Sequence, residues 1–290
     1  MKLATIRLNG KESAALHTSR GYLTIEAVNR ACGADWPEDL LELIQSGRLQ
    51  DLKEWYRDGG ERLLAAAPTV SQENAELKPL YRNPGKIWGI GMNYVRDEAE
   101  LRHKPADEEP VGFMKPATAL IGPNDAILLP SGAGTITAEA ELAIIIGKRC
   151  RHLTEEEAHT AVAGFTTALD MTAADVHGRN PRFLTRAKSY DTFLSLGPQL
   201  VTPDEIPDVL RLSVSTVLNG EEAFRNRIFN MKFRPWHTVA FHSSFMTLLP
   251  GDVILTGTPG PVVIRDGDTV ECRIDGFAPL ANPVARLEDE

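Results

Sequence analysis

Residues 137–147, TAEAELAIIIG, place two glutamates directly before one of the most apolar stretches of the chain. Such an apolar run is typical of a buried strand. In a strand, side chains at positions i and i+2 point to the same face, so Glu139 and Glu141 are expected side by side at the mouth of this strand. Carboxylates removed from water either gain a partner or become protonated. The stretch therefore raises the question of what compensates its charge.

A second segment with strand composition, GFTTALD (164–170), ends in a third carboxylate, Asp170. If the three carboxylates converge, they form an all-oxygen ligand set of the kind that Mg²⁺ or Mn²⁺ prefers, with the remaining positions left to water and substrate. The alternative is that Glu139 and Glu141 bind arginines or cap a strand end, because Glu-x-Glu is a common tripeptide. The local pattern leaves both interpretations open.

Composition narrows the class of protein. The 290 residues suffice for one large domain or two modest ones. The formal net charge of -9 argues against nucleic acid or an anionic membrane as a partner. No stretch has the apolarity of a signal peptide or of a membrane span. Three scattered cysteines without CxxC spacing favour a reducing, cytoplasmic location over disulfides or a zinc site.

The pattern of residue types changes after the first quarter of the chain. We predict a small N-terminal α+β domain over 1–75, with KLATIRL and YLTIEAV as the arms of a hairpin and two helices after it. The polar stretch 71–85 has the composition of a linker. From Lys86 onward, short apolar runs alternate with glycine and proline, which predicts a β-rich domain over 76–290.

Five ordered motifs give this second part a family resemblance: the segment 86–285 resembles the fumarylacetoacetate hydrolase family. The matching stretches are GIGMNYVRDEAE (89–100), AEAELAIIIGK (138–148), ALDMTAADVH (168–177), AKSYDTFLSLGP (187–198) and LLPGDVILTGTPG (248–260). The resemblance implies an α+β, β-rich fold, with a mixed β-sandwich roll as the metal-dependent catalytic domain and a small α+β domain before it. It also implies a homodimer.

The resemblance further assigns roles to individual residues. It implies one Mg²⁺ or Mn²⁺ per subunit and a small oxo acid or β-diketone as substrate. The implied metal ligands are Glu139, Glu141 and Asp170. Lys188 is implied to be either a catalytic lysine or one that supports the metal ligands, and the implied substrate contacts are Thr258, Gly257 and Tyr94.

Three positions depart from the family pattern. The histidine of the first motif is Asp97 here, although its glutamate partner is retained as Glu100. The arginine and glutamine that follow the metal aspartate are Ala174 and His177. In one interpretation catalysis is rewired, with Asp97, His177 or His103 acting as the base. In the other, activation of water is lost and only chemistry through a metal-stabilised enolate remains.

These observations lead to competing hypotheses for function. The leading one is a divalent-metal-dependent hydrolase that cleaves a C–C bond in a β-diketone or acylpyruvate-type oxo acid through a metal-stabilised enolate. The first alternative is a 2-oxo acid decarboxylase, tautomerase or dehydratase at the same site. The second alternative is a catalytically silent ligand-binding protein.

Overall fold

A computed structural model describes residues 1–105 and 107–287. The strands are β1 (Lys2–Leu8), β2 (Lys11–Thr18), β3 (Gly21–Thr24), β4 (Glu76–Lys78), β5 (Ile87–Gly91), β6 (Val111–Lys115), β7 (Leu120–Ile121), β8 (Ile127–Leu129), β9 (Ile136–Ile146), β10 (Val162–Ala173), β11 (Leu194–Leu196), β12 (Gln199–Val201), β13 (Ser213–Leu218), β14 (Glu221–Arg227), β15 (Val253–Leu255), β16 (Pro261–Val263), β17 (Thr269–Ile274) and β18 (Leu280–Arg286). The helices are α1 (Ile25–Cys32), α2 (Leu40–Gln45), α3 (Arg48–Trp55), α4 (Glu61–Leu63), α5 (Glu98–Leu101), α6 (Ala174–Arg179), α7 (Leu184–Ala187) and α8 (Pro235–Phe245).

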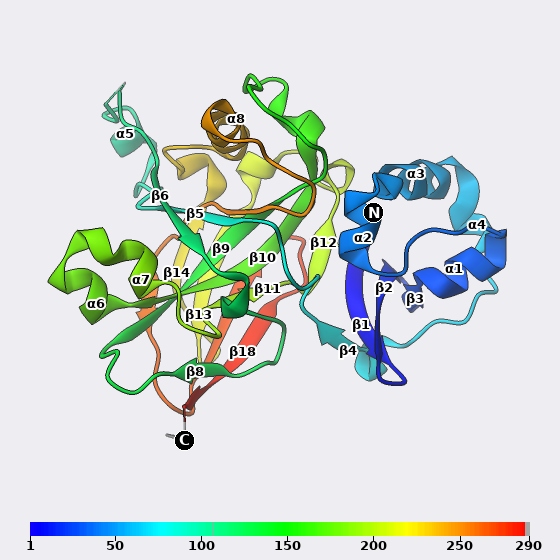
Figure 1. Ribbon diagram of the computed structural model, residues 1–290, viewed down its shortest axis with the longest axis horizontal. Helices are drawn as coiled ribbons and strands as arrows, with labels where there is room; N and C mark the ends of the chain where they lie inside the picture. Colours follow the sequence, from blue (N-terminus) through cyan, green and yellow to red (C-terminus); the bar gives the residue numbers. More distant parts are fainter. Residues whose placement is uncertain (106, 288–290) are drawn as a thin grey trace.

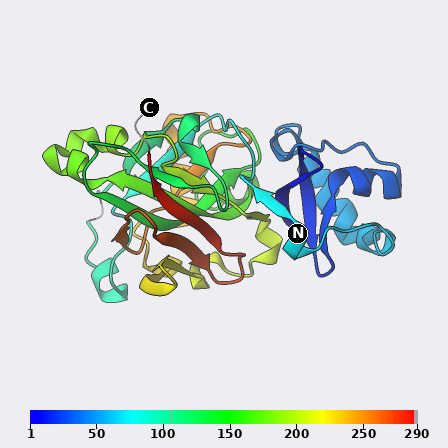
Figure 2. The same cartoon turned by 90° about the horizontal axis from the view of Figure 1, so that it is seen from below.

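Two lobes lie side by side, the N-terminal elements in one and the remaining strands in the other (Figures 1 and 2). A continuous run of strands joins them, in the order β3-β2-β1-β12-β10-β9-β15-β5-β6. The junction is antiparallel pairing of β1 with β12. The segment expected to be a linker contributes β4, which pairs with β1. The fold is thus α+β and β-rich, and its main sheet runs through both lobes.

The long strand β9 lies at the centre of the larger lobe, between β10 and β15. Its side chains enter two apolar cores, since Leu142 and Ile144 belong to one while Ala143 and Ile145 belong to the other. Burial on both faces explains why this strand is a continuous apolar run and not an alternating one. A second sheet, β14-β13-β17-β18-β8, covers the first of these cores.

The predicted N-terminal hairpin is wrong in its pairing. The chain turns at Asn9 and Gly10, both with positive φ, and KESAALHT forms β2 beside β1. YLTIEAV is divided, because β3 ends at Thr24 and α1 begins at Ile25. The Thr24 side chain accepts a hydrogen bond from Ala27 N, so a helix N-cap interrupts what reads as one strand.

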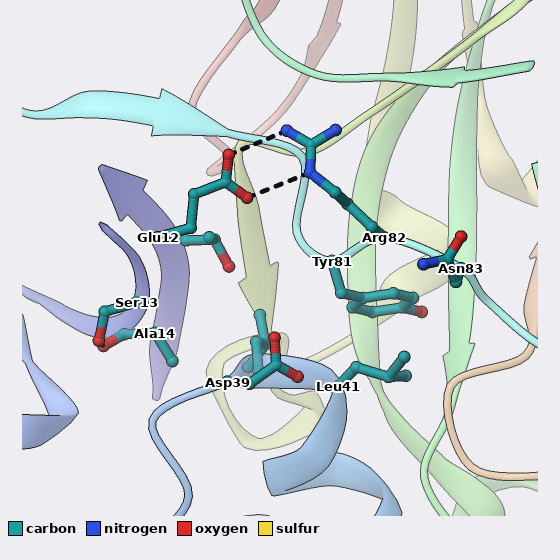
Figure 3. Close-up of a pocket in the computed structure, with 10 residues that line it drawn as sticks. Glu12, Ser13, Ala14, Asp39, Leu41, Tyr81, Arg82 and Asn83 are labelled. Carbon is teal, nitrogen blue, oxygen red and sulfur yellow. Dashed lines mark hydrogen bonds and ion pairs between the residues drawn. The ribbon is translucent and has the colours of Figure 1, made fainter. Parts of the chain in front are cut away.

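Figure 3 shows the junction between the N-terminal lobe and the chain that leads into β5. Arg82 donates from Nε and Nη2 to the Glu12 carboxylate, at 3.2 and 2.9 Å. Tyr81 Oη donates to the Gly251 carbonyl at 3.0 Å. These contacts connect β2, residues 81–82 and the turn before β15, and they line a small cavity of about 290 Å³ remote from the carboxylates of β9. Among the described residues, no helix is long and apolar enough to cross a membrane.

Candidate active site

The register of β9 and β10 assembles the three predicted carboxylates. Asp170 pairs directly with Glu139, and Ala168 pairs with Glu141. Residues 139, 141 and 170 therefore project from the same face of the sheet. Oxygens from the three side chains lie within 4.8 Å of one another. Asp170 and Glu141 are buried, while Glu139 is partly exposed.

Glu141 is the most strongly perturbed of these groups. Burial raises the pKa of its carboxyl well above the usual range, and the charges of Asp170 and Glu139 raise this pKa further. The Gly257 N–H donates to Glu141 Oε2 at 2.6 Å and favours the charged form. Gly257 has φ +94°, and a Cβ there would lie 2.8 Å from Asn93 Cβ, so the position requires glycine. The predicted role of Gly257 in substrate binding remains untested, since its N–H is directed at Glu141.

Lys188 lies against the carboxylates. Its ammonium donates to Glu139 Oε2 at 2.8 Å, to Thr172 Oγ1 at 2.9 Å and to Asp170 Oδ2. Burial lowers the pKa of Lys188, but the charges of Asp170, Glu139 and Glu141 outweigh this and raise it overall. The ammonium also lies 4.5 Å from the centroid of the Phe113 ring. Lys188 therefore stays charged at neutral pH.

A second lysine, Lys115 on β6, places another positive charge beside Asp170. Its Nζ lies 2.7 Å from Asp170 Oδ1, and both side chains have 0% exposure. It also donates to the carbonyls of Met171, Phe193 and Lys188. Burial lowers the pKa of Lys115 to about 8 against the opposing effect of Asp170. Lys115 thus holds Asp170 and the backbone at Lys188 in place.

The donor set fits a divalent cation. All three side chains offer oxygen, the ligand type that Mg²⁺ and Mn²⁺ prefer. The 4.8 Å spread of these oxygens is close to the span across an octahedral Mg²⁺, which is roughly 4.2 Å. When Glu141 is ionised, the three carboxylates face only two ammonium groups, and a divalent cation would compensate the remaining negative charge. Glu139, Glu141 and Asp170 are therefore able to hold the ion.

The carboxylates open into a cavity of about 430 Å³. Its polar lining consists of Glu139, Glu141, Thr172, His177, Lys188 and Thr258. His177 reaches it from α6, directly after β10, and Thr258 from the turn after β15. The structure thus brings two further predicted residues, His177 and Thr258, to the same cavity as the carboxylates and Lys188.

Three predicted residues from the 89–100 motif lie outside this cavity. Asp97 caps the exposed helix α5 by accepting from Glu100 N at 2.9 Å, and α5 stands at the upper left edge of Figure 1. Glu100 Oε2 accepts from Arg96 N at 2.7 Å, which lowers its pKa. Tyr94 packs against the core, and burial raises the pKa of its hydroxyl. Local capping therefore satisfies Asp97 and Glu100 on the exposed helix. The Tyr94 hydroxyl differs, because it is buried without a hydrogen-bond partner and the charge of Glu141 adds to the rise in its pKa.

The other candidate replacements are also exposed. His103 Nδ1 lies 2.8 Å from the carbonyl of Ala99, four residues earlier in the chain. Arg179, a candidate to substitute for the family arginine that is Ala174 here, donates to the carbonyl of Asp175 at 3.3 Å. His177 is therefore the imidazole that lines the cavity among the described histidines.

Sequence reasoning missed Lys115 and Asn93. Lys115 ends the otherwise apolar strand VGFMK, and a lysine in such a strand is a signal of a buried charge that needs partners. Asn93 is fully buried and donates to the carbonyls of Phe233 and Thr256, at 2.9 and 2.7 Å, so it fixes the turn that carries Gly257. Gly89 leaves room for the Phe113 ring, which lies against Lys188.

Known proteins resemble this chain over most of its length. A family model described as fumarylacetoacetate (FAA) hydrolase C-terminal matches residues 86–285. The mitochondrial oxaloacetate tautomerase fahd2 of Xenopus laevis is 36% identical over 271 residues, which is 84% of this chain and 85% of that protein. Maleylpyruvate hydrolase from Sphingobium sp. SYK-6, in complex with manganese(II) and pyruvate, superposes with a TM-score of 0.80 at 28% identity over 99% of this chain and 100% of that one. Fumarylacetoacetate hydrolase from Exiguobacterium antarcticum gives a TM-score of 0.83 at 28% identity, with the same coverage.

Proposed function

This chain belongs to the fumarylacetoacetate hydrolase family, and from that premise we propose that it is a divalent-cation-dependent keto–enol tautomerase of a short 2-oxo acid. One observation carries the proposal. The described cavity lining offers His177 for proton transfer and the charged Lys188 for stabilising an enolate, whereas Asp97 and Glu100 lie on the exposed helix α5. Moving one proton between carbon and oxygen needs such groups, but cleavage by water also needs a base that activates water.

A divalent cation held by Glu139, Glu141 and Asp170 supplies Lewis-acid polarisation of the substrate's 2-oxo group. The chain's own residues supply the rest. The Lys188 ammonium, charged and fixed by hydrogen bonds, lies where it stabilises negative charge on the enolate oxygen. Thr258 adds a hydroxyl at the cavity wall.

His177 is the proposed proton carrier. For ketonisation, the enol oxygen loses one proton and C3 of the substrate gains one, so the reaction needs no water and releases no group. An imidazole can accept a proton at one ring nitrogen and return it from the same atom. His177 follows the β10 strand that carries Asp170 by a few residues, which supports its reach to a substrate bound there.

Hydrolysis of a C–C bond is the second candidate. The likeness to a maleylpyruvate hydrolase over 99% of the chain favours it. This reaction requires a base that activates water. The cavity has such a base only if His177 takes this role or if α5 moves and brings Asp97 or Glu100 into the cavity. Decarboxylation and dehydration of a 2-oxo acid remain alternatives at the same site.

The test is to follow the enol forms of oxaloacetate and phenylpyruvate by ultraviolet absorbance, with Mg²⁺, with Mn²⁺ and with EDTA. With at least one of the two enols, we expect ketonisation above the buffer rate that EDTA abolishes and either metal restores. Parallel incubation with an acylpyruvate, analysed by NMR, detects hydrolysis as a pair of acids. Acid pairs without enhanced ketonisation would overturn the proposal in favour of hydrolysis. The homodimer also remains a prediction, to be tested by light scattering.

A further inference from the structure

The cavity lining divides into a polar half, which includes the residues of β9 and β10, and an apolar half, which includes the residues at the ends of β5 and β6. Strand β15 lies between β9 and β5 in the main sheet. The polar half surrounds the carboxylates, as described above. The side chains of the other half are Ile90, Met92, Val111, Pro181 and Leu184, with Gly91 between the first two. Among the described lining residues, this half offers no arginine, lysine or hydrogen-bonding side chain.

The apolar half is built from two parts of the chain. Ile90 and Gly91 end β5, and Val111 begins β6, where it pairs with Gly91. Pro181 and Leu184 come from the segment between α6 and α7. These side chains line the same cavity as Glu139 and Glu141, so the remaining atoms of a substrate bound through a cation at the carboxylates would meet them.

Two of the apolar side chains are unusually exposed. Met92 has 73% exposure and Val111 has 43%. Met92 also has φ +54°, a strained value for a side chain with Cβ, in the turn that leads to the buried Asn93. Apolar side chains held at the rim of a cavity are typical of a surface that a ligand covers.

We propose that this half of the cavity selects 2-oxo acids whose substituent beyond the reacting carbon is apolar and uncharged, such as an alkyl or aryl group. The inference rests on the proposed function for the placement of the 2-oxo acid group. A second carboxylate in this half would lose water without gaining a charged partner, whereas an alkyl group would bury against Met92, Val111 and Leu184.

Binding of inert analogues tests the proposal without relying on turnover. N-propyloxamate and N-carboxymethyloxamate share the 2-oxo acid group and have similar size, but only the second has a distal carboxylate. Titration calorimetry with saturating Mn²⁺ is expected to give at least about tenfold tighter binding of N-propyloxamate. Equal or tighter binding of N-carboxymethyloxamate would overturn the inference. Preference for N-propyloxamate without any enol turnover would instead contradict the proposed tautomerase and leave the apolar subsite standing.

A charged side chain introduced into the apolar half of the cavity provides a second test of the proposal. Val111→Lys introduces a cation at an exposed position on β6, so we expect it to reverse the preference toward N-carboxymethyloxamate. Met114→Lys is the matched control, because Met114 lies on the same strand with 38% exposure but is outside the cavity lining. The control is expected to retain the wild-type ratio. If both variants shift the ratio equally, the effect is general electrostatics and the subsite assignment is wrong.

Discussion

The β9–β10 pair and helix α5 both carry acidic residues that the family resemblance assigns to the site, yet they behave differently. On β9 and β10, strand pairing places Asp170 opposite Glu139 and buries it completely. On α5, Asp97 and Glu100 are exposed and bond to the helix backbone. Carboxylates in a buried sheet need external compensation, whereas those on a short exposed helix are satisfied locally and by water.

The largest effect is expected from removing a carboxylate of the β9–β10 pair. Glu141→Ala should lower kcat/KM for enol ketonisation by more than about a hundredfold, since loss of groups that merely support metal ligands already costs 10–100-fold. Calorimetry should show a matching loss of Mn²⁺ affinity. Asp97→Ala is the control from the other region and should retain metal binding. Equal losses in both variants would contradict the distinction between the two regions.

The second largest effect is expected from removing the Lys115 ammonium, which contacts Asp170. Lys115→Met leaves Asp170 buried with one partner fewer, which should lower the free energy of unfolding by about 3–5 kcal/mol and reduce activity. Urea denaturation and steady-state kinetics measure the two effects. Lys86→Met is the control: Lys86 pairs at 2.6 Å with Asp252, another buried carboxylate outside the cavity lining. Lys86→Met should be less stable than wild type but retain its kcat/KM. If Lys115→Met also retains its kcat/KM, Lys115 has no role at the site.

His242 is a buried histidine outside the cavity lining, and we expect it to affect stability but not activity. Burial lowers its pKa from 6.5 to about 4, so it is neutral in the folded chain and becomes protonated below pH 6.5 in the unfolded chain. The unfolded state then binds more protons, and stability should fall by roughly 3 kcal/mol as the pH drops from 6.5 to 4.

Comparing His242→Gln with wild type by urea denaturation across this range should show the pH dependence reduced by that amount. Activity at neutral pH should be unchanged, because the His242 ring faces Trp88, Phe241 and Phe245 and lies outside the cavity lining. An unchanged pH slope would mean that another group dominates the acid response.

The smallest effects are expected on α5. Asp97→Ala removes a helix cap worth about 1 kcal/mol at most, in a helix of one turn that packs loosely. Asp97→His, which restores the family residue, should leave kcat/KM for ketonisation nearly unchanged. A clear fall in activity with Asp97→His would show instead that α5 closes over the cavity during turnover and that Asp97 belongs to a rewired site.

Much of the fold could be predicted, but not its connections. The apolar run of β9 predicts a strand wherever it lies in space, and the five motifs predict the family. The N-terminal hairpin could not be predicted, because Thr24 both continues a strand pattern and caps a helix. The pairing of β1 with β12, across about two hundred residues, has no local signal at all.

For the site, the sequence by itself determined the chemistry of the carboxylates: the i, i+2 spacing places Glu139 and Glu141 on one face, and the motif order adds Asp170 and Lys188. Only the tertiary structure decided which of the remaining candidates share their cavity. His177 does so because α6 starts where β10 ends, while Asp97 and Glu100 do not because α5 stands away from the sheet. Lys115 and the apolar half of the cavity likewise depend on contacts between distant strands. Such contacts are set by packing, for which residue spacing along the chain carries no information.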